Sequence, residues 1–521
     1  MEVTDPDLMR RAMLDGVRDR ATSDAFDFDA ELRAILAPLG LKPEDSGGTI
    51  RTDKRDPLMR SQVRLGAASA LGLVQQSVVA AHIWKLRTGL GQDISIDLGQ
   101  AIRRLAPATE LKWETINGLP PAIADKTIGA YLGFFPAKDG RQVIPANIYP
   151  DIKSRMLSAL GCADNPQALA AAIARYTADE LEQMGEAGGF VMGKVRSVEE
   201  FVTEPVFEYL ASRPLIEITK IADSSPEPFA EFGTAPLSGI RALGMGHVIA
   251  GAGIGRSLAS LGADVLNLWR AMEWEHEALL ITANVGMRSA RMNVRSQAGR
   301  EQLYGLLRDA DVFFANRRPG LLDDLGLDAE TAAAIRPGLI HVTVSTHGMD
   351  GPWRNRVGFD QVAGAVTGMV AAEGTLENPQ LPPTSIVNDY LVAWLGATGA
   401  MTALARRAAE GGSYQVHVSL DRAAMWILSL GMFAKDYVPS VAGTGGQHEL
   451  IDPQLFTSLT PLGIYQGVTE NVTLSRTPHH YANVLSPQGA DQALWLPKPE
   501  ALEARNVLAV LTGAAARNSR K

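Results

Sequence analysis

Apolar residues follow two different rhythms along the chain, and these rhythms predict where helices and strands lie. Residues 68–91 are mostly apolar and Ala-rich and end in glycine, a pattern that predicts a long buried helix closed by a glycine cap. Residues 93–98 then alternate, with Ile94, Ile96 and Leu98 separated by polar residues. A period of two is typical of a strand with one buried face.

The same helix–glycine–strand unit recurs late in the chain. Residues 391–412 form a second apolar helical run that ends in glycines, and residues 414–420 form a second alternating run. Aligned without gaps, Ile94 falls on Val416, an offset of 322 (416 − 94 = 322), and later positions keep this offset. One long offset indicates the duplication of a single unit, whereas a solenoid would repeat at a short period.

Between the two units, strand-like and helix-like runs alternate. Residues 236–390 contain the strand-like runs GIRALGMG, GADVLNLW, DADVFFAN and GLIHVTVST, with helical patterns at AGREQLYGLLRDA and LDAETAAAIRP. This alternation predicts an α/β domain with a parallel sheet. Residues 125–235 differ, because an Asp-Gly pair between apolar flanks predicts a β-hairpin and a capping box at Ser197 and Glu200 predicts a helix start. Residues 223–228, rich in serine and proline, predict a linker.

The composition narrows the classes of protein to consider. The chain has 521 residues, 46% of them hydrophobic, which is enough for more than one buried core. A net charge of −9 argues against a general nucleic-acid binder. A single cysteine, Cys162, allows neither an internal disulfide nor a cysteine-based zinc site, and the histidines lack metal-ligand spacing. Without an apolar signal core or a run of ~20 apolar residues, we expect a cytoplasmic protein that holds no metal and contacts no membrane.

A glycine-rich stretch at 247–266, HVIAGAGIGRSLASLGADVL, is close to a nucleotide-binding loop. A dinucleotide fingerprint requires G-x-G-x-x-G and an acidic residue at the end of the next strand. Here Arg256 occupies the place of the last glycine, and residues 264–270 end in arginine with no carboxylate near the end. The glycine spacing alone therefore favours a tight turn that lets a helix pack on the sheet, and leaves a phosphate-bearing cofactor as the alternative.

Longer runs give a family resemblance. Between 236 and 430 the chain contains, in this order, PLSGIRAL, VIAGAGIGRSLASLGADVL, GMRSARMNV, AGREQLYGLLRDADVFFANRRPGLLDDLGL, RPGLIHVTVSTHGMDGPW, GFDQVAGAVTGM and NDYLVAWLGATGAMTALARR. These runs resemble those of the family III CoA-transferases, which include formyl-CoA:oxalate CoA-transferase and α-methylacyl-CoA racemase. The resemblance implies a Rossmann-like parallel sheet domain that binds CoA, and a smaller α+β domain joined to it by long linker helices.

The resemblance also implies a reordered, partly duplicated chain. Family members run from large domain to small domain to return segment. Here we expect a lead-in at 1–59, a linker helix and small domain at 60–235, the CoA-binding domain with the second linker copy at 236–430, and a return segment at 431–521. Family dimers interlock, which implies a homodimer, and the residues leave open whether this reordered chain keeps that dimer.

The family's chemistry would fall on one aspartate. The resemblance places the nucleophile at Asp389, in TSIVNDYLVAWLG, where a carboxylate attacks an acyl-CoA thioester and later forms an aspartyl-CoA thioester. An ordinary aspartate pKa near ~3.9 would suffice. The alternative for a single Asp before an apolar helix is an N-cap. The first copy has Ala67 at the equivalent position (389 − 322 = 67), so we expect one active site per chain.

The resemblance also assigns the groups that would bind CoA. They are His247, Val248, Ile249, Arg270, Arg288, Asn316 and Arg317. For each arginine the alternative is a solvated surface charge. The sequence departs from the family's pattern at Asp324, Trp269 and Ala252, and Phe359 stands where the racemase branch has a proton-carrying histidine.

The leading hypothesis is an acyl-CoA:carboxylate CoA-transferase that acts on acyl-CoA and small carboxylate substrates. A racemase or isomerase relative on the same fold is an alternative within enzymes. A catalytically weak or inactive CoA-binding homologue is the alternative from another class. An NAD(P) oxidoreductase is more distant, because the dinucleotide fingerprint is incomplete.

Overall fold

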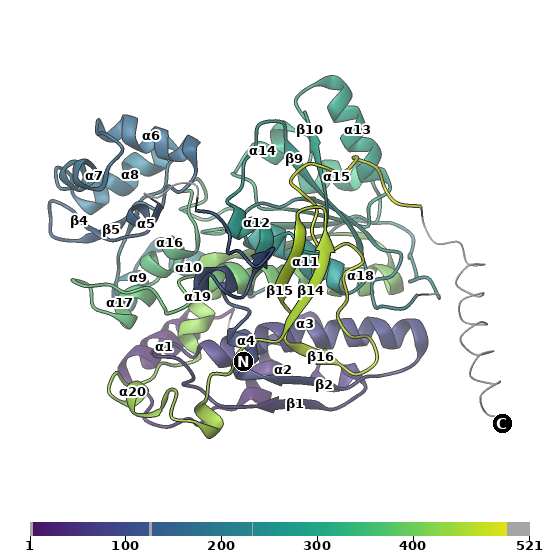
Figure 1. Cartoon of the computed structure of the whole chain (residues 1–521), viewed down its shortest axis with the longest axis horizontal. Coiled ribbons are helices and arrows are strands. Elements are labelled where there is room, and N and C mark those ends of the chain that lie inside the picture. Colours follow the sequence, from purple (N-terminus) through teal and green to yellow (C-terminus); the bar gives the residue numbers. More distant parts are fainter. Residues whose placement is uncertain (1–3, 124–127, 232, 498–521) are drawn as a thin grey trace.

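A seven-stranded sheet forms the centre of the larger domain. The computed structural model describes residues 4–123, 128–231 and 233–497 (Figure 1). Six strands of the sheet are parallel, and β7 pairs antiparallel with β13 at one edge. In spatial order the strands are β10 (Arg288–Met292), β9 (Asp264–Arg270), β8 (Arg241–Met245), β11 (Val312–Ala315), β12 (Ile340–Ser345), β13 (Ser413–Ser419) and β7 (Glu217–Ala222).

The parallel strands follow the doubly wound order. Counted from β8, the spatial order is third, second, first, fourth, fifth and sixth, so the winding reverses between β8 and β11. In sheets of this kind, ligands bind at the carboxyl ends of the strands where the winding reverses. The α/β class and the strands expected at β8, β9, β11 and β12 are therefore confirmed. The edge strand β10 was not expected, because its sequence RSARM places arginine among small residues.

Helices cover both faces of this sheet, which explains the nearly continuous apolar runs of its strands. Neighbouring residues of one strand point into different layers. Phe313 packs in an apolar cluster with residues of α13 (Gln297–Arg308) and α15 (Ala329–Ile335). Phe314 packs on the opposite side, in the cluster that contains α11 (Ala250–Ser260) and α18 (Asn388–Glu410).

The two similar units of the sequence have similar surroundings in the structure. α3 (Leu65–Thr88), β2 (Ile94–Asp97) and α4 (Leu98–Ile102) correspond to α18, β13 and α19 (Leu420–Ser429). β2 has a parallel neighbour, β1 (Ile50–Asp53), and an antiparallel one, β16 (Val472–Leu474), just as β13 has β12 and β7. The antiparallel neighbours differ in their place along the chain, because β7 precedes its partner β13 whereas β16 follows its partner β2.

The two units also face each other directly. α3 and α18 pack together (Figure 1). A Cβ on Gly72 would lie 2.8 Å from Trp394, the residue at the equivalent position of the second copy (72 + 322 = 394). A residue that touches its own counterpart is typical of an interface with twofold-like symmetry.

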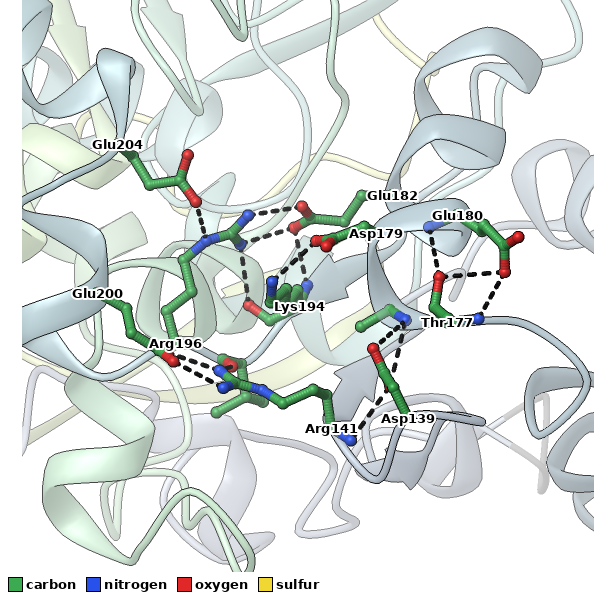
Figure 2. Close-up of polar contacts among 12 residues, drawn as sticks. Asp139, Arg141, Thr177, Asp179, Glu180, Glu182, Lys194, Arg196, Glu200 and Glu204 are labelled. Atoms are coloured by element: carbon green, nitrogen blue, oxygen red, sulfur yellow. Dashed lines mark hydrogen bonds and ion pairs between the residues drawn. The ribbon is translucent and has the colours of Figure 1, made fainter.

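The smaller domain lies to one side of the sheet and has its own apolar core (Figure 1, blue). The expected hairpin is present, with β4 and β5 pairing antiparallel around a turn in which Gly140 has φ +77°. Arg196 is buried and donates to both oxygens of Glu182, at 2.8 and 2.7 Å, and to Glu204 at 2.7 Å (Figure 2). Glu182 also pairs with Arg356 of the larger domain at 3.2 Å, so one carboxylate joins the two domains.

The remaining elements complete the domains and the connections. No helix in the described ranges is both long enough and apolar enough to cross a bilayer. The smaller domain contains α5 (Ile128–Tyr131), β4 (Phe135–Pro136), β5 (Gln142–Ile144), α6 (Pro150–Leu160), α7 (Pro166–Ile173), α8 (Ala178–Gly188) and β6 (Gly193–Lys194). The other elements are α1 (Pro6–Arg18), α2 (Phe28–Leu36), β3 (Thr115–Ile116), α9 (Val198–Phe201), α10 (Pro205–Ala211), α12 (Glu277–Ala283), α14 (Leu321–Asp324), α16 (Asp360–Val366), α17 (Met369–Glu373), α20 (Tyr437–Val441), β14 (Leu455–Thr460) and β15 (Gly463–Val468).

Candidate active site

A cavity of about 1090 Å³ lies between the carboxyl ends of the strands and α6 of the smaller domain. Its walls come from both domains. Six of the residues singled out in the sequence line it, namely His247, Val248, Arg270, Asn316, Arg317 and Asp389. Ile249 and Arg288 do not line it. The cavity sits where the winding of the sheet reverses, which is the expected place for a ligand.

Asp389 lies in the first turn of α18 and lines the cavity, although the residue is only 5% exposed. Asp360, in the first turn of α16, accepts hydrogen bonds from the backbone N–H of Val387 at 3.0 Å and of Asp389 at 2.8 Å. Asp360 therefore satisfies two of the free N–H groups at the start of α18. The N-cap role considered for Asp389 belongs to Asp360, and the carboxylate of Asp389 is left for other chemistry.

The two carboxylates differ in their surroundings. Burial, and then the charge of Asp360, raise the pKa of Asp389 well above its ordinary value. Burial raises the pKa of Asp360 to about 6, although backbone N–H groups lower it in part. Among the described residues, none donates a hydrogen bond to the Asp389 carboxylate. The sequence analysis required no more than an ordinary pKa for Asp389, and the rise could not be foreseen there, because neither the burial nor the nearby Asp360 is visible in the sequence.

The glycine run lies inside α11 and not in the loop before it. A Cβ on Gly251 would collide with Asn316, and one on Gly253 would lie 2.7 Å from Ala393 of α18. Gly255 is enclosed in the same way, and none of the three has a left-handed backbone. The glycines thus allow α11 to pack closely on the sheet and on α18, as the spacing alone favoured.

The loop between β8 and α11 is fixed by side chains from elsewhere. Val248 has φ +58°, a conformation that a β-branched residue rarely adopts. Its N–H donates to Glu275 at 2.9 Å. Asn316 accepts from the N–H of His247 at 2.9 Å and donates to its carbonyl at 2.8 Å. Ile249 follows and is buried in the core, so its side chain anchors the loop.

The arginines differ in how far they are available to a ligand. Arg317 forms a bidentate ion pair with Glu273. Burial raises the pKa of Glu273, but the charge and hydrogen bonds of Arg317 outweigh this effect and lower the pKa to about 2. Arg270 is exposed at the end of β9 and donates to Glu273 at 3.1 Å. Arg288 lies at the opposite ends of the strands, where it pairs with Asp264 at 2.9 Å. Arg288 is therefore left out of the site proposed below.

The smaller domain contributes an aromatic side chain that the sequence did not single out. Tyr149 donates to Glu275 at 2.6 Å, so Glu275 links the smaller domain to the loop at Val248. The Tyr149 ring stacks on Phe359, with centroids 5.8 Å apart, and lies 5.0 Å from the ring of His247. Phe359 thus serves as an aromatic wall. The smaller domain has no motif that could have identified Tyr149.

Besides His247, the histidines His341, His347 and His417 line the cavity, and each of the three has a partner; His341 bonds to the carbonyl of Leu327 at 2.8 Å. Nδ1 of His347 lies 2.7 Å from a carboxylate oxygen of Asp421, and both residues are buried. His417 bonds to the hydroxyls of Thr343 and Ser345 at 2.9 and 3.0 Å. Burial lowers the pKa of His417 to about 3, so its ring is neutral at physiological pH.

The first copy of the unit keeps the cap without the nucleophile. Asp56 accepts from the N–H of Gly66 at 3.0 Å and of Ala67 at 2.7 Å, the arrangement that Asp360 makes with the start of α18. Burial raises the pKa of Asp56 to about 6. Ala67 is 1% exposed and does not line the cavity at Asp389.

The chain is similar in sequence to proteins that are named as CoA-transferases. The "Succinyl-CoA--L-malate CoA-transferase alpha subunit" of Chloroflexus aurantiacus is 30% identical over 41% of this chain and 56% of its own length. The "Acetyl-coenzyme A transferase nodX" of Hypoxylon pulicicidum is 32% identical over 38% of this chain and 35% of its own. The chain thus spans only part of these relatives.

A solved structure of a CAIB/BAIF family protein from Brucella suis is 25% identical over 44% of this chain and 65% of that one, with a TM-score of 0.35. The model of CoA-transferase family III matches residues 237–509, just over half of the chain. That span contains the six parallel strands of the sheet, the loop between β8 and α11, and Asp389. The chain therefore belongs to CoA-transferase family III.

Proposed function

We propose that the protein is an acyl-CoA:carboxylate CoA-transferase that works through a covalent intermediate on Asp389. The observation that supports this most directly is a buried carboxylate that accepts no hydrogen bond from the described residues and lines a large cavity at the reversal point of the sheet. A structural carboxylate with this burial would be paired or hydrogen-bonded. Asp360, beside it, is used in that way and Asp389 is not.

The proposed reaction has two symmetrical halves. The Asp389 carboxylate attacks the acyl carbonyl of the donor, the carbon–sulfur bond breaks, and CoA thiolate leaves a mixed anhydride. The thiolate then attacks the aspartyl carbonyl, which releases the donor acid and gives an aspartyl-CoA thioester. An acceptor carboxylate repeats the two steps in reverse, which yields a new acyl-CoA and restores Asp389. No oxidant or reductant is required.

The surroundings of Asp389 support this role. A poorly solvated carboxylate with a raised pKa is a stronger nucleophile than one in water, provided that it is ionised. The cap by Asp360 fixes the start of α18, so that the carboxylate is held in one place. His247 and Val248, and behind them Asn316, would present the backbone to CoA. The names of the relatives suggest short organic acids as substrates.

One chain supplies all the cavity walls described above. Tyr149 and Arg155 come from the smaller domain, and Asp389 comes from the larger one. We therefore propose that one chain can hold one complete site. The homodimer implied by the family resemblance stays a prediction, and size-exclusion chromatography with light scattering would test it.

The test is to trap the intermediate and locate it. The protein is incubated with an acyl-CoA and then with hydroxylamine, which converts an activated aspartate into a hydroxamate. Residues 357–405 contain no Lys or Arg, so Asp360 and Asp389 fall in one tryptic peptide and must be separated by fragmentation. We expect a hydroxamate on Asp389 and none on Asp360, and no adduct in Asp389→Asn. CoA binding without an adduct would instead indicate an inactive CoA-binding homologue.

A further inference from the structure

A buried pair of side chains forms part of the cavity wall and has no task in the reaction proposed above. His347 follows the end of β12 and lines the cavity, although it is only 3% exposed. Its Nδ1 lies 2.7 Å from Oδ2 of Asp421, in the first turn of α19. Each step of the proposed transfer joins or separates a carbonyl carbon and an anion, so no proton has to move. The pair is therefore free to recognise the substrate.

The ring of His347 is held so that one nitrogen remains for a ligand. Asp421 is fully buried, and the Trp353 ring stands edge-on to the imidazole, with the two centroids 5.5 Å apart. Neither of these two residues lines the cavity, so Nδ1 is turned away from it. Within the described ranges, Nε2 of His347 forms no hydrogen bond and no ion pair. An unpaired nitrogen on a side chain buried to this degree indicates that a ligand supplies the partner.

Two other histidines of the wall show the contrast. His417, on the neighbouring strand β13, bonds through its two nitrogens to the hydroxyls of Thr343 and Ser345. His341 bonds to the carbonyl of Leu327, and its other nitrogen is enclosed by protein atoms. Neither of these two rings has a nitrogen left for a molecule in the cavity.

Hydrogen bonds connect the pair to the proposed nucleophile along the same wall. Thr346, the residue before His347, donates through its hydroxyl to the carbonyl of Gly358 at 3.2 Å. Two residues after Gly358, Asp360 accepts from the N–H of Asp389 at 2.8 Å. Apart from Asp360, all of these residues line the cavity. An acid whose reacting carboxyl group lies at Asp389 therefore has the His347 ring on the same wall.

The burial of Asp421 determines what Nε2 can offer. A fully buried carboxylate requires a counter-ion, and His347 is the one ion-pair partner of Asp421 among the described residues. The second oxygen of Asp421, Oδ1, accepts no hydrogen bond from them. Burial raises the pKa of Asp421, and the charge and hydrogen bond of His347 lower it in part. The pair thus favours a protonated imidazole, in which both nitrogens are donors.

We infer that Nε2 of His347 donates a hydrogen bond to a second carboxylate group of the transferred acid, one that does not react. This inference rests on the proposed function, and it names the substrate class as short dicarboxylic acids. A carboxylate oxygen suits this donor because hydrogen bonds between charged groups are the strong ones. An aliphatic acid would leave the Nε2–H buried without an acceptor. Asp421 is the positioning residue that holds the ring.

The experiment compares succinyl-CoA with butyryl-CoA, whose acyl groups have the same number of carbon atoms. Exchange of each ¹³C-labelled acid into its own CoA ester is followed by mass spectrometry. We expect the wild type to exchange succinate with a kcat/KM about 100-fold higher than butyrate. His347→Phe keeps a ring and removes the donor, so it should lose this preference, with the succinate value falling and the butyrate value staying near wild type. His480→Phe is the matched control, since His480 is exposed and does not line the cavity.

A second variant keeps the inference testable if His347→Phe does not fold. Asp421→Asn keeps the shape of the pair and removes the charge that holds the ring, so it should lower the same succinate-to-butyrate ratio. Equal rates for the two acids in the wild type, or a wild-type ratio in either folded variant, overturn the inference. Faster exchange of 3-hydroxybutyrate than of succinate also overturns it, because the group recognised would then be a hydroxyl. If no ester exchanges and no hydroxamate forms on Asp389, the proposed function fails instead.

Discussion

The pair of Glu273 and Arg317 gives a prediction whose size follows from the structure. Both side chains are about 5% exposed or less, and Arg317 also donates to the carbonyl of Met245 at 2.7 Å at the end of β8. Replacing Glu273 by Gln keeps the shape and removes the charge. It leaves the Arg317 guanidinium buried without its counter-ion, which is a costly change. We expect Glu273→Gln to destabilise the larger domain.

The magnitude comes from the pKa of Glu273. It is about 2 in the folded protein against an ordinary value of 4.5, a difference of about 2.5 pKa units. At 1.36 kcal/mol per unit, the ionised carboxylate contributes about 3 kcal/mol to the free energy of unfolding. Because the folded pKa lies below the unfolded one, this contribution is complete above pH 4.5. It is lost as the pH falls through about 2.

The assay is urea-induced unfolding of wild type and Glu273→Gln at several pH values between 7 and 3. The difference in free energy of unfolding should be about 3 kcal/mol at pH 7 and should shrink below pH 4.5. Glu377→Gln is the control, since Glu377 is exposed and forms no ion pair with any described residue, and it should change little. A difference below about 0.5 kcal/mol at pH 7 would refute the reasoning, because surface substitutions reach that size.

Two further substitutions test the site from other directions. Asp389→Asn should raise the thermal stability at pH 7.5 and not at pH 4. The raised pKa in the folded protein makes the wild-type carboxylate destabilising only where the same group is ionised in the unfolded state. Melting curves at both pH values test this, and an equal or lower Tm of the variant at pH 7.5 contradicts it. Gly251→Ala should weaken CoA binding about 10-fold or more, because the added Cβ displaces Asn316 from the N–H of His247. Calorimetry measures the affinity, and a wild-type value would show that the loop tolerates the displacement of Asn316.

Local patterns in the sequence predicted much of the fold. The long helices at α3 and α18 have apolar runs that end in glycine, β12 is rich in β-branched residues, and β13 alternates apolar and polar residues. Those features are decided by nearby residues, so they can be read without a structure. The strand β10 was not predicted, because an edge strand tolerates exposed arginine and its sequence shows no apolar periodicity.

The site was predictable only where a residue's role is set by its own segment. Asp389 was found through the family resemblance, but its raised pKa depends on Asp360, 29 positions earlier (389 − 360 = 29), and on burial. Arg317 was assigned to CoA, whereas its partner Glu273 lies in another loop. Arg155 was missed because it comes from a domain without motifs. Long-range pairing of charges cannot be derived from spacing along the chain.

The two copies of the unit allow the roles of the neighbouring aspartates to be separated. Asp56 caps α3 through the N–H of Ala67, where no nucleophile exists, and burial still raises its pKa to about 6. Asp360 caps α18 in the same way, and burial raises its pKa to the same value. Capping and burial are therefore sufficient to explain an aspartate at 360 and its pKa, and neither requires Asp389. Asp360 lies close to Asp389 because it caps the helix that carries Asp389. An aspartate in the first turn after such a cap therefore has a raised pKa, since it is buried and lies beside the charge of the capping residue.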